Sequence, residues 1–166
     1  CCISMNDPGM IVLPTHRLWR GLPEIDSTTL IEKLQPVFDC TLAGNGAGEA
    51  NAIWQKVMVD DIQGQMGFYC AKDDQWVLAS MNAAGAEMMS ERLSDKSEPW
   101  RELGVSILHE LVVPELLNFD DVATPKYVRS IDEVIEGIEN GDSAGRDATG
   151  QEGIAGRFEL VSIVMP

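Results

Sequence analysis

Three consecutive side chains near the start of the chain could bind or act on an anion. They are Thr15, His16 and Arg17, and Arg20 adds another cation close by. Arginine can grip a phosphate or carboxylate with two donors, threonine offers a hydroxyl donor, and histidine can act as a base or a further donor. Thr15, His16 and Arg17 are therefore anion-binding candidates, with His16 as the catalytic candidate. The alternative is that these cations pair with some of the 27 Asp and Glu residues.

The backbone around these candidates decides whether they can act together. The turn-forming residues Asn6 to Gly9 predict a hairpin whose two strands cover residues 1–18. In a continuing strand Thr15 and Arg17 would share one face, and His16 would lie on the other. The three side chains converge only if the backbone turns there, and Pro14, which cannot donate to a sheet ladder, is compatible with such a turn.

Two other motifs resemble functional sites but fit structural roles better. The glycine-rich stretch 44–48 lies between a predicted strand and a predicted helix, as in a dinucleotide-binding loop. Glu49 places an anion where the pyrophosphate would have to sit, so we expect a plain connection. His109 and Glu110 are neighbours on a predicted helix and point about 100° apart. We expect His109 to be a hydrogen-bonded core residue and Pro114 to bend the helix locally.

Composition narrows the class of protein. The chain has 166 residues, of which 45% are hydrophobic and 23% charged, which predicts one globular domain over 1–166. The net charge of -15 disfavours nucleic acid and anionic membrane surfaces as partners, whereas the candidates above favour a small anionic ligand. The four cysteines lack disulfide or zinc spacing, so we expect a cytoplasmic, reduced protein without a metal. No apolar run is long enough to span a membrane, and no motif indicates a particular cofactor.

Hydrophobic periodicity predicts an α+β fold, with a mixed, largely antiparallel sheet and helices packed on it. The first half of the chain should contain a helix within 23–38 capped by Asp26 or Ser27, a strand over 38–42, and an amphipathic helix starting near Ala50. Strands over 68–71 and 76–79 should form a hairpin. Residues 82–96 have a broken apolar stripe and predict a loop with some helix.

The second half should begin with a buried helix that carries Leu103 to Val112 and is capped by Ser97 or Asp95. A short strand over 126–129 should lead into a helix that opens with a capping box of Ser130 and Glu133. Residues 141–157 are rich in Gly, Asp and Ser and predict a mobile polar loop before a final strand. Both termini fall inside predicted strands, so we expect a fragment of a longer protein.

Three stretches of the chain resemble a known family. Met5 to Leu18 resembles the "M-x-D-P-G-L-x-I-L-P-T-H-R-L" segment of the bacterial and archaeal domain-of-unknown-function family one thousand and fifteen. Leu108 to Leu117 and Val128 to Ile138 are similar to later stretches of that family. The resemblance implies that the chain is the central-to-C-terminal portion of a longer family member.

What the resemblance implies about function is limited, because the family has no established activity. Its members carry an Asp-Gly-His-His-Arg motif upstream of the position where this chain begins, and that motif resembles one in ParB-like and free-serine-kinase proteins. The implied function is a phosphate- or nucleotide-handling enzyme whose site the upstream segment completes. The alternative is a non-catalytic structural or protein-interaction domain.

Overall fold

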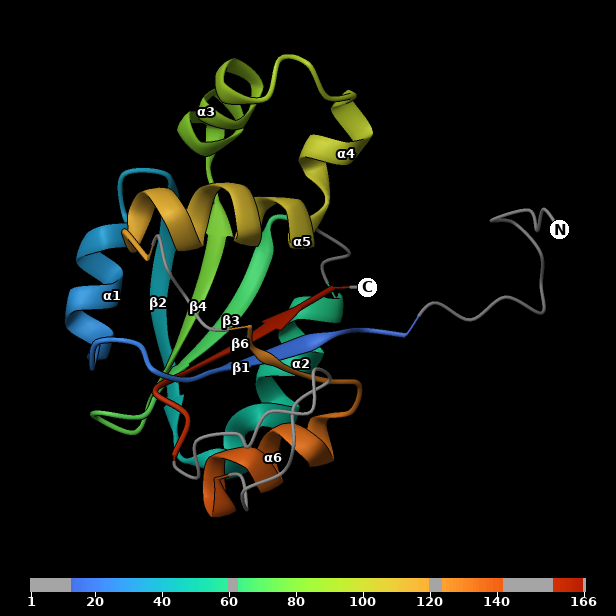
Figure 1. Cartoon of the computed structure of the whole chain (residues 1–166). Coiled ribbons are helices and arrows are strands. Elements are labelled where there is room, and N and C mark those ends of the chain that lie inside the picture. The colour runs from blue at the N-terminus through green and yellow to red at the C-terminus, as the bar shows by residue number, and fades with distance from the viewer. Residues whose placement is uncertain (1–12, 60–62, 120–123, 142–156, 166) are drawn as a thin grey trace, which may run out of the picture.

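A computed structural model describes residues 13–59, 63–119, 124–141 and 157–165 (Figure 1). The strands are β1 (His16–Trp19), β2 (Phe38–Asn45), β3 (Gln65–Cys70), β4 (Gln75–Met81), β5 (Lys126–Val128) and β6 (Leu160–Val164). The helices are α1 (Ser27–Leu34), the 3-10 turn η1 (Ala47–Glu49), α2 (Ala50–Val59), α3 (Ala83–Arg92), α4 (Glu98–Glu102), α5 (Gly104–Ile107), the π-helix η2 (Leu108–Leu116) and α6 (Ile131–Asn140). Within these ranges no helix has the length and apolar character needed to cross a membrane.

The six strands form one sheet in the order β2-β4-β3-β6-β1-β5. Every pairing among the described strands is antiparallel, and β1 lies between β6 and the short edge strand β5. Arg17 of β1, for example, is opposite Ser162 on one side and Tyr127 on the other. The α+β prediction is confirmed.

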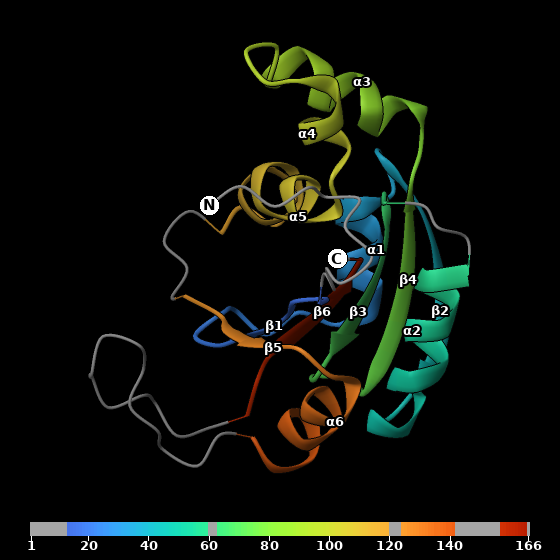
Figure 2. The same ribbon diagram turned by 90° about the vertical axis from the view of Figure 1, so that its right-hand side faces the viewer.

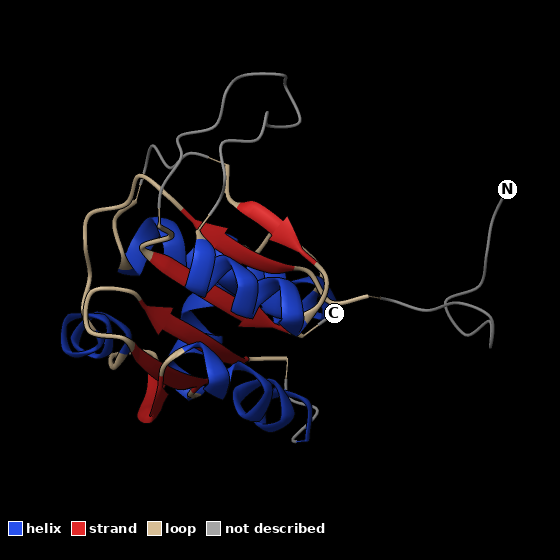
Figure 3. Cartoon of the chain, turned by 90° about the horizontal axis from the view of Figure 1, so that it is seen from below, coloured by secondary structure: helices blue, strands red, loops and turns tan. Residues whose placement is uncertain are grey.

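Helices cover both faces of this sheet. We call the side covered by α1 and η2 the η2 face, and the side covered by α2 and α6 the α2 face. Figure 2 shows α5 and α2 on opposite sides of β3 and β4, and Figure 3 shows the helices and strands from below. Each face has its own core: Trp19 packs with Phe68 and Leu111 on the η2 face, and Leu18 packs with Ile53 and Val134 on the α2 face. Neighbouring residues Leu18 and Trp19 enter different cores because side chains alternate along a strand.

The N-caps predicted for two helices, α1 and α6, are present in the structure. The Asp26 side chain accepts from the Thr29 amide at 2.8 Å and begins α1. Ser130 and Glu133 form the predicted capping box of α6, which ends at Gly141 with a φ of 65°. On α6, a β-carbon at Gly137 would lie 2.2 Å from a methyl carbon of Leu18, so only glycine allows this helix to approach β1 so closely.

Two segments differ from the prediction. Residues 83–92 form the ten-residue helix α3, capped by the Asn82 side chain, where we expected a loop with some helix. The apolar stripe there was broken because only Gly85 and Met89 of α3 are buried. The single helix predicted from Ser97 to Val112 is instead divided into α4, α5 and η2.

Other predictions fall on residues outside the described ranges. They include the first strand of the 1–18 hairpin and nearly all of the 141–157 loop. The hairpin of β3 and β4 is confirmed, with Cys70 opposite Gln75 at its closed end.

Candidate functional site

Arg17 lies in the middle of β1 and points to the η2 face. Only 5% of the residue is exposed. Its Nε donates to Nε2 of His109 at 3.0 Å, and a terminal nitrogen donates to the carbonyl oxygen of Thr15. The Tyr127 ring, on β5, lies 5.7 Å from the guanidinium carbon. Burial lowers the Arg17 pKa, but arginine titrates so far above neutrality that the group keeps its charge.

Arg17 has neutral hydrogen-bond partners in place of a carboxylate. Among the residues that the structure describes, no Asp or Glu lies within ion-pair distance of its guanidinium. No carboxylate contributes to its pKa shift either, since the causes are burial and Tyr127. In a chain of net charge -15, a buried cation without an anionic neighbour among the described residues is unexpected.

His109, the partner of Arg17, lies on the π-helix η2, which contains Pro114. Proline has no amide hydrogen for the carbonyl four residues earlier, and the segment adopts the wider hydrogen-bond spacing of η2, as between Leu117 N and Val112 O at 2.9 Å. Burial, and then the charge of Arg17, lower the His109 pKa, which keeps the ring neutral. Because Nε2 accepts from Arg17, the ring proton lies on Nδ1.

His16 lies on the other face of the sheet. It is fully buried, and its ring meets that of Trp54 on α2 at 5.0 Å in an edge-on arrangement. Both ring nitrogens lack a hydrogen-bond partner among the described residues. Burial and the nearby Arg17 charge lower its pKa to about 4, against a weaker opposing effect of Glu133. The ring is therefore neutral at physiological pH.

The structure thus does not bring the three predicted side chains together. Thr15 and Arg17 meet, through the Thr15 carbonyl, whereas His16 points to the opposite face. Convergence required a turn at Pro14, but the residues that follow it continue as the extended strand β1, which is paired on both sides. Arg20 is also separate, since its guanidinium lies over the Phe158 ring at 4.2 Å, in the core of the α2 face.

The glycine-rich stretch contains a side chain where a phosphate would bind. Gly44 and Asn45 belong to β2, and the Glu49 side chain folds back over Gly44. A β-carbon at Gly44 would lie only 2.8 Å from Cγ of Glu49. The carboxylate occupies this turn, as its position in the sequence indicated.

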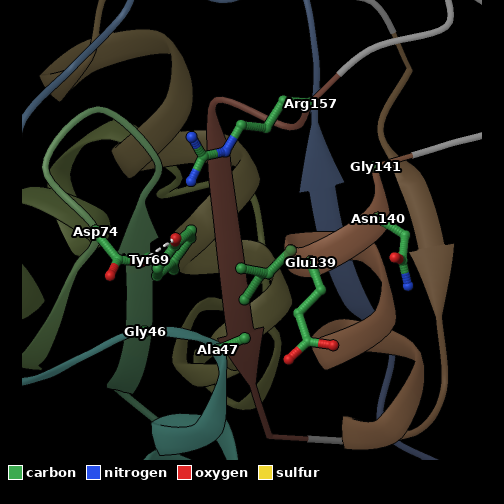
Figure 4. Close-up of a pocket in the computed structure, with 9 residues that line it drawn as sticks. Gly46, Ala47, Tyr69, Asp74, Glu139, Asn140, Gly141 and Arg157 are labelled. Carbon is green, nitrogen blue, oxygen red and sulfur yellow. Dashed lines mark hydrogen bonds between the residues drawn. The ribbon is translucent and has the colours of Figure 1, made fainter.

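The structure has a hollow of about 620 Å³ on the α2 side that the sequence did not predict (Figure 4). Its lining comes from the end of β2 and η1, the β3–β4 hairpin, the last turn of α6, and Arg157. These segments are distant in the chain and share no motif. A local signal was present in Gly46 and Gly141, whose positive φ values of 79° and 65° place sharp turns at its rim.

The comparisons with known proteins identify a family and no function. The model of the family described as protein of unknown function (DUF1015) matches residues 1–106, which is more than half of the chain. The chain therefore belongs to this family. The match includes Thr15 to Arg17 and ends before the resemblances at Leu108 to Leu117 and Val128 to Ile138. No curated protein and no solved structure matches the chain.

Proposed function

We propose that this family member binds a small anion, such as a phosphate group, at Arg17 on the η2 face of the sheet. The observation that carries the proposal is the buried guanidinium of Arg17, which has no carboxylate partner among the described residues. Burying a charge without a counter-charge costs several kcal/mol (on the order of 3–5) when a partner is missing. An anionic ligand would supply the counter-charge and offset that cost.

The hydrogen bonds of Arg17 hold its guanidinium in one orientation. His109 fixes Nε and the Thr15 carbonyl fixes one terminal nitrogen, and within the described residues the other terminal nitrogen is left for a ligand. Tyr127 beside it is 50% exposed and belongs to the edge strand β5, so a ligand could approach from that edge. Thr15 and His109 act in this proposal as positioning residues for Arg17.

The proposal extends to an enzyme that handles phosphate groups or nucleotides, with further catalytic groups supplied by a segment before residue 1. His16, the catalytic candidate in the sequence, is buried against Trp54 on the α2 face, on the other side of the sheet from Arg17. We therefore place the anion at Arg17 and assign no reaction step to His16.

A second candidate function is a non-catalytic structural domain. The Arg17 to His109 bond favours it, because this bond joins β1 to η2 across 92 residues of sequence. Under that hypothesis Arg17 serves the fold, and its replacement lowers stability whether or not an anion is present. The two functions therefore differ in what an Arg17 variant does.

Thermal unfolding with added phosphate, sulfate or chloride at matched ionic strength tests the proposal. A ligand that binds only the folded state stabilises it by about 2.7 kcal/mol at a hundredfold excess over its Kd. We expect phosphate to raise the Tm of the wild type above the chloride control, and Arg17→Ala to abolish that increase.

Arg101→Ala is the matched control, because Arg101 is on α4 and its guanidinium bonds to Ser90. It removes the same charge and should keep the phosphate-dependent increase. The absence of an anion-specific increase in the wild type, or its persistence in Arg17→Ala, would refute the proposed site.

A further inference from the structure

The strand β2 lies at one end of the sheet, and the only described strand that pairs with it is β4 (Figure 1). The strand at the other end, β5, has 3 residues, whereas β2 has 8. A strand at a sheet edge presents a row of main-chain donors and acceptors with which another strand can pair. The long edge of β2 is therefore the stronger candidate for an interaction surface.

The hydrogen bonds to β4 show which main-chain groups of β2 face outward. Just before the strand, the Asn82 amide donates to the Val37 carbonyl at 3.0 Å. In an antiparallel pair, alternate residues direct both main-chain groups to the same neighbour. The register stays regular up to Leu42, so Asp39 and Thr41 also face β4. The residues between them direct their amides and carbonyls to the open edge, and these are Phe38, Cys40 and Leu42.

This part of β2 lacks the features that usually block an exposed edge. Proline, lysine and inward-pointing charges are common devices of this kind. The segment from Phe38 to Leu42 has no proline and no lysine, and its one charged residue, Asp39, is exposed. A register shift between Leu42 and Gly44 interrupts the strand, so regular pairing should end at Leu42.

Leu42 is an apolar side chain at this edge, and 61% of it is exposed. Side chains alternate along a strand, so Leu42 shares a face with Phe38 and Cys40. Phe38 belongs to the core of the η2 face and Cys40 packs against it, so Leu42 extends this core to the open edge. Burial and the charge of Asp39 raise the pKa of the Cys40 thiol to about 11, so the thiol is neutral and acts as a small apolar group.

We propose that β2 pairs with β2 of a second copy of this chain, antiparallel and about a two-fold axis at Cys40. Phe38 then lies opposite Leu42 of the second copy, and the outward-facing residues of the two strands bond to one another. The exposed Leu42 side chain is covered on the η2 face, where the two cores join. The pairing goes beyond the anion site at Arg17, which lies on β1 near the other end of the sheet.

The pattern of side chains favours a second copy over an unrelated strand. From Phe38 to Leu42, apolar and polar residues alternate in an order that reads the same in both directions. A two-fold pairing about Cys40 therefore places apolar side chains together on the η2 face. On the α2 face it places Asp39 opposite Thr41 of the second copy, so the two Asp39 carboxylates do not face each other.

Sedimentation velocity of the whole chain over a range of concentrations tests the proposal. We expect a reversible equilibrium between monomer and dimer in the wild type, with a Kd below about 1 mM. Leu42→Asp places a carboxylate opposite Phe38 of the second copy, twice in each dimer, and should weaken the dimer about tenfold or more. Leu42 is exposed, so this variant should fold normally, and circular dichroism checks this.

The charge at position 41 tests the register. Thr41 is exposed and would lie opposite Asp39 of the second copy. Opposite charges stabilise such cross-strand pairs and like charges destabilise them, so Thr41→Lys should tighten the dimer about two- to tenfold and Thr41→Glu should weaken it by a similar factor.

Ser94→Lys is the control for net charge, because copies of a chain with a charge of -15 repel each other and any added lysine reduces that repulsion. Ser94 is exposed and follows α3, away from β2 in the chain and in the fold. Its variant should dimerise nearly as the wild type does. A wild type that stays monomeric at about 1 mM, an unchanged Kd in Leu42→Asp, or equal effects of Thr41→Lys and Ser94→Lys would overturn the proposal.

Discussion

β1 buries one titratable side chain on each face of the sheet, and the two faces accommodate them differently. On the α2 face, His16 packs against Trp54 and loses its charge, since burial lowers its pKa to about 4. On the η2 face, Arg17 cannot lose its proton at any ordinary pH and remains a buried cation. Histidine avoids the cost of burial by becoming neutral, whereas arginine needs acceptors and, in our proposal, an anion.

Two adjacent residues of β1, Arg17 and Leu18, also differ in how they are held: Arg17 makes hydrogen bonds, whereas Leu18 packs in a hydrophobic core. Leu18 is a fully buried residue of β1 that packs against Gly137 of α6, so it stabilises the fold through apolar contacts in the core of the α2 face. Arg17, one residue earlier, is held by hydrogen bonds to His109 and Thr15. Substitutions at these positions should therefore affect different properties of the protein.

The largest effect is expected at Leu18. Leu18→Ala leaves a cavity opposite Gly137, where no β-carbon can fill the space, and should lower the free energy of unfolding by about 2–5 kcal/mol. Urea unfolding followed by circular dichroism measures this loss. Phosphate-dependent stabilisation, expressed as the change in Tm, should persist in whatever fraction still folds. A loss below 1 kcal/mol, on the order of a surface substitution, would mean that α6 does not pack on β1 as described.

The second prediction concerns pH and the α2 face. In the unfolded chain His16 should titrate near 6.5, and in the fold near 4, so the unfolded state binds more protons between these values. Stability should therefore be highest above pH 6.5 and fall as the pH decreases to about 4, by on the order of 3 kcal/mol for a shift of this size. Unfolding free energies measured at several pH values give the slope.

His16→Phe identifies the group responsible. Phenylalanine keeps an aromatic ring against Trp54 and removes the titration, so the slope between pH 6.5 and 4 should become flatter. A remaining slope is expected from His109, the other histidine of the chain, whose pKa is also lowered by burial. An unchanged slope in His16→Phe would show that His16 is not buried as a neutral ring.

Local rules explain why much of the fold could be predicted. Asp26 and the pair Ser130 and Glu133 cap their helices through contacts three residues apart, which the sequence alone displays. The helix α3 was harder to predict because few of its residues are buried, so the apolar periodicity that indicates a helix is weak there. The π-helix η2 was foreseen only as bending at Pro114, since the wider spacing depends on how the whole segment packs.

The site was less predictable because distant segments build it. The alternation rule already placed His16 on the face opposite Arg17 unless the chain turned at Pro14, and the sequence does not show whether it turns. What keeps β1 extended is its pairing with β5 and β6, more than a hundred residues later in the chain. The contact between Arg17 and His109 could not be predicted from the sequence either, because the two residues are 92 positions apart and meet only in the folded protein.

The smallest effect on stability is expected for Arg17→Met. This variant distinguishes most directly between anion binding and a structural role for Arg17. Arg17→Met keeps much of the length of the side chain and removes the buried charge, and replacing buried charges by apolar groups is often neutral or stabilising. It also removes the donors to His109 and Thr15, which costs about 0.5–1.5 kcal/mol per bond. The two terms oppose each other, so we expect the free energy of unfolding in chloride buffer to change by less than about 1 kcal/mol.

The phosphate-dependent rise in Tm should nevertheless disappear. A loss of several kcal/mol in chloride alone would instead show that Arg17 is there to hold η2 on β1, and the structural function would replace the anion site.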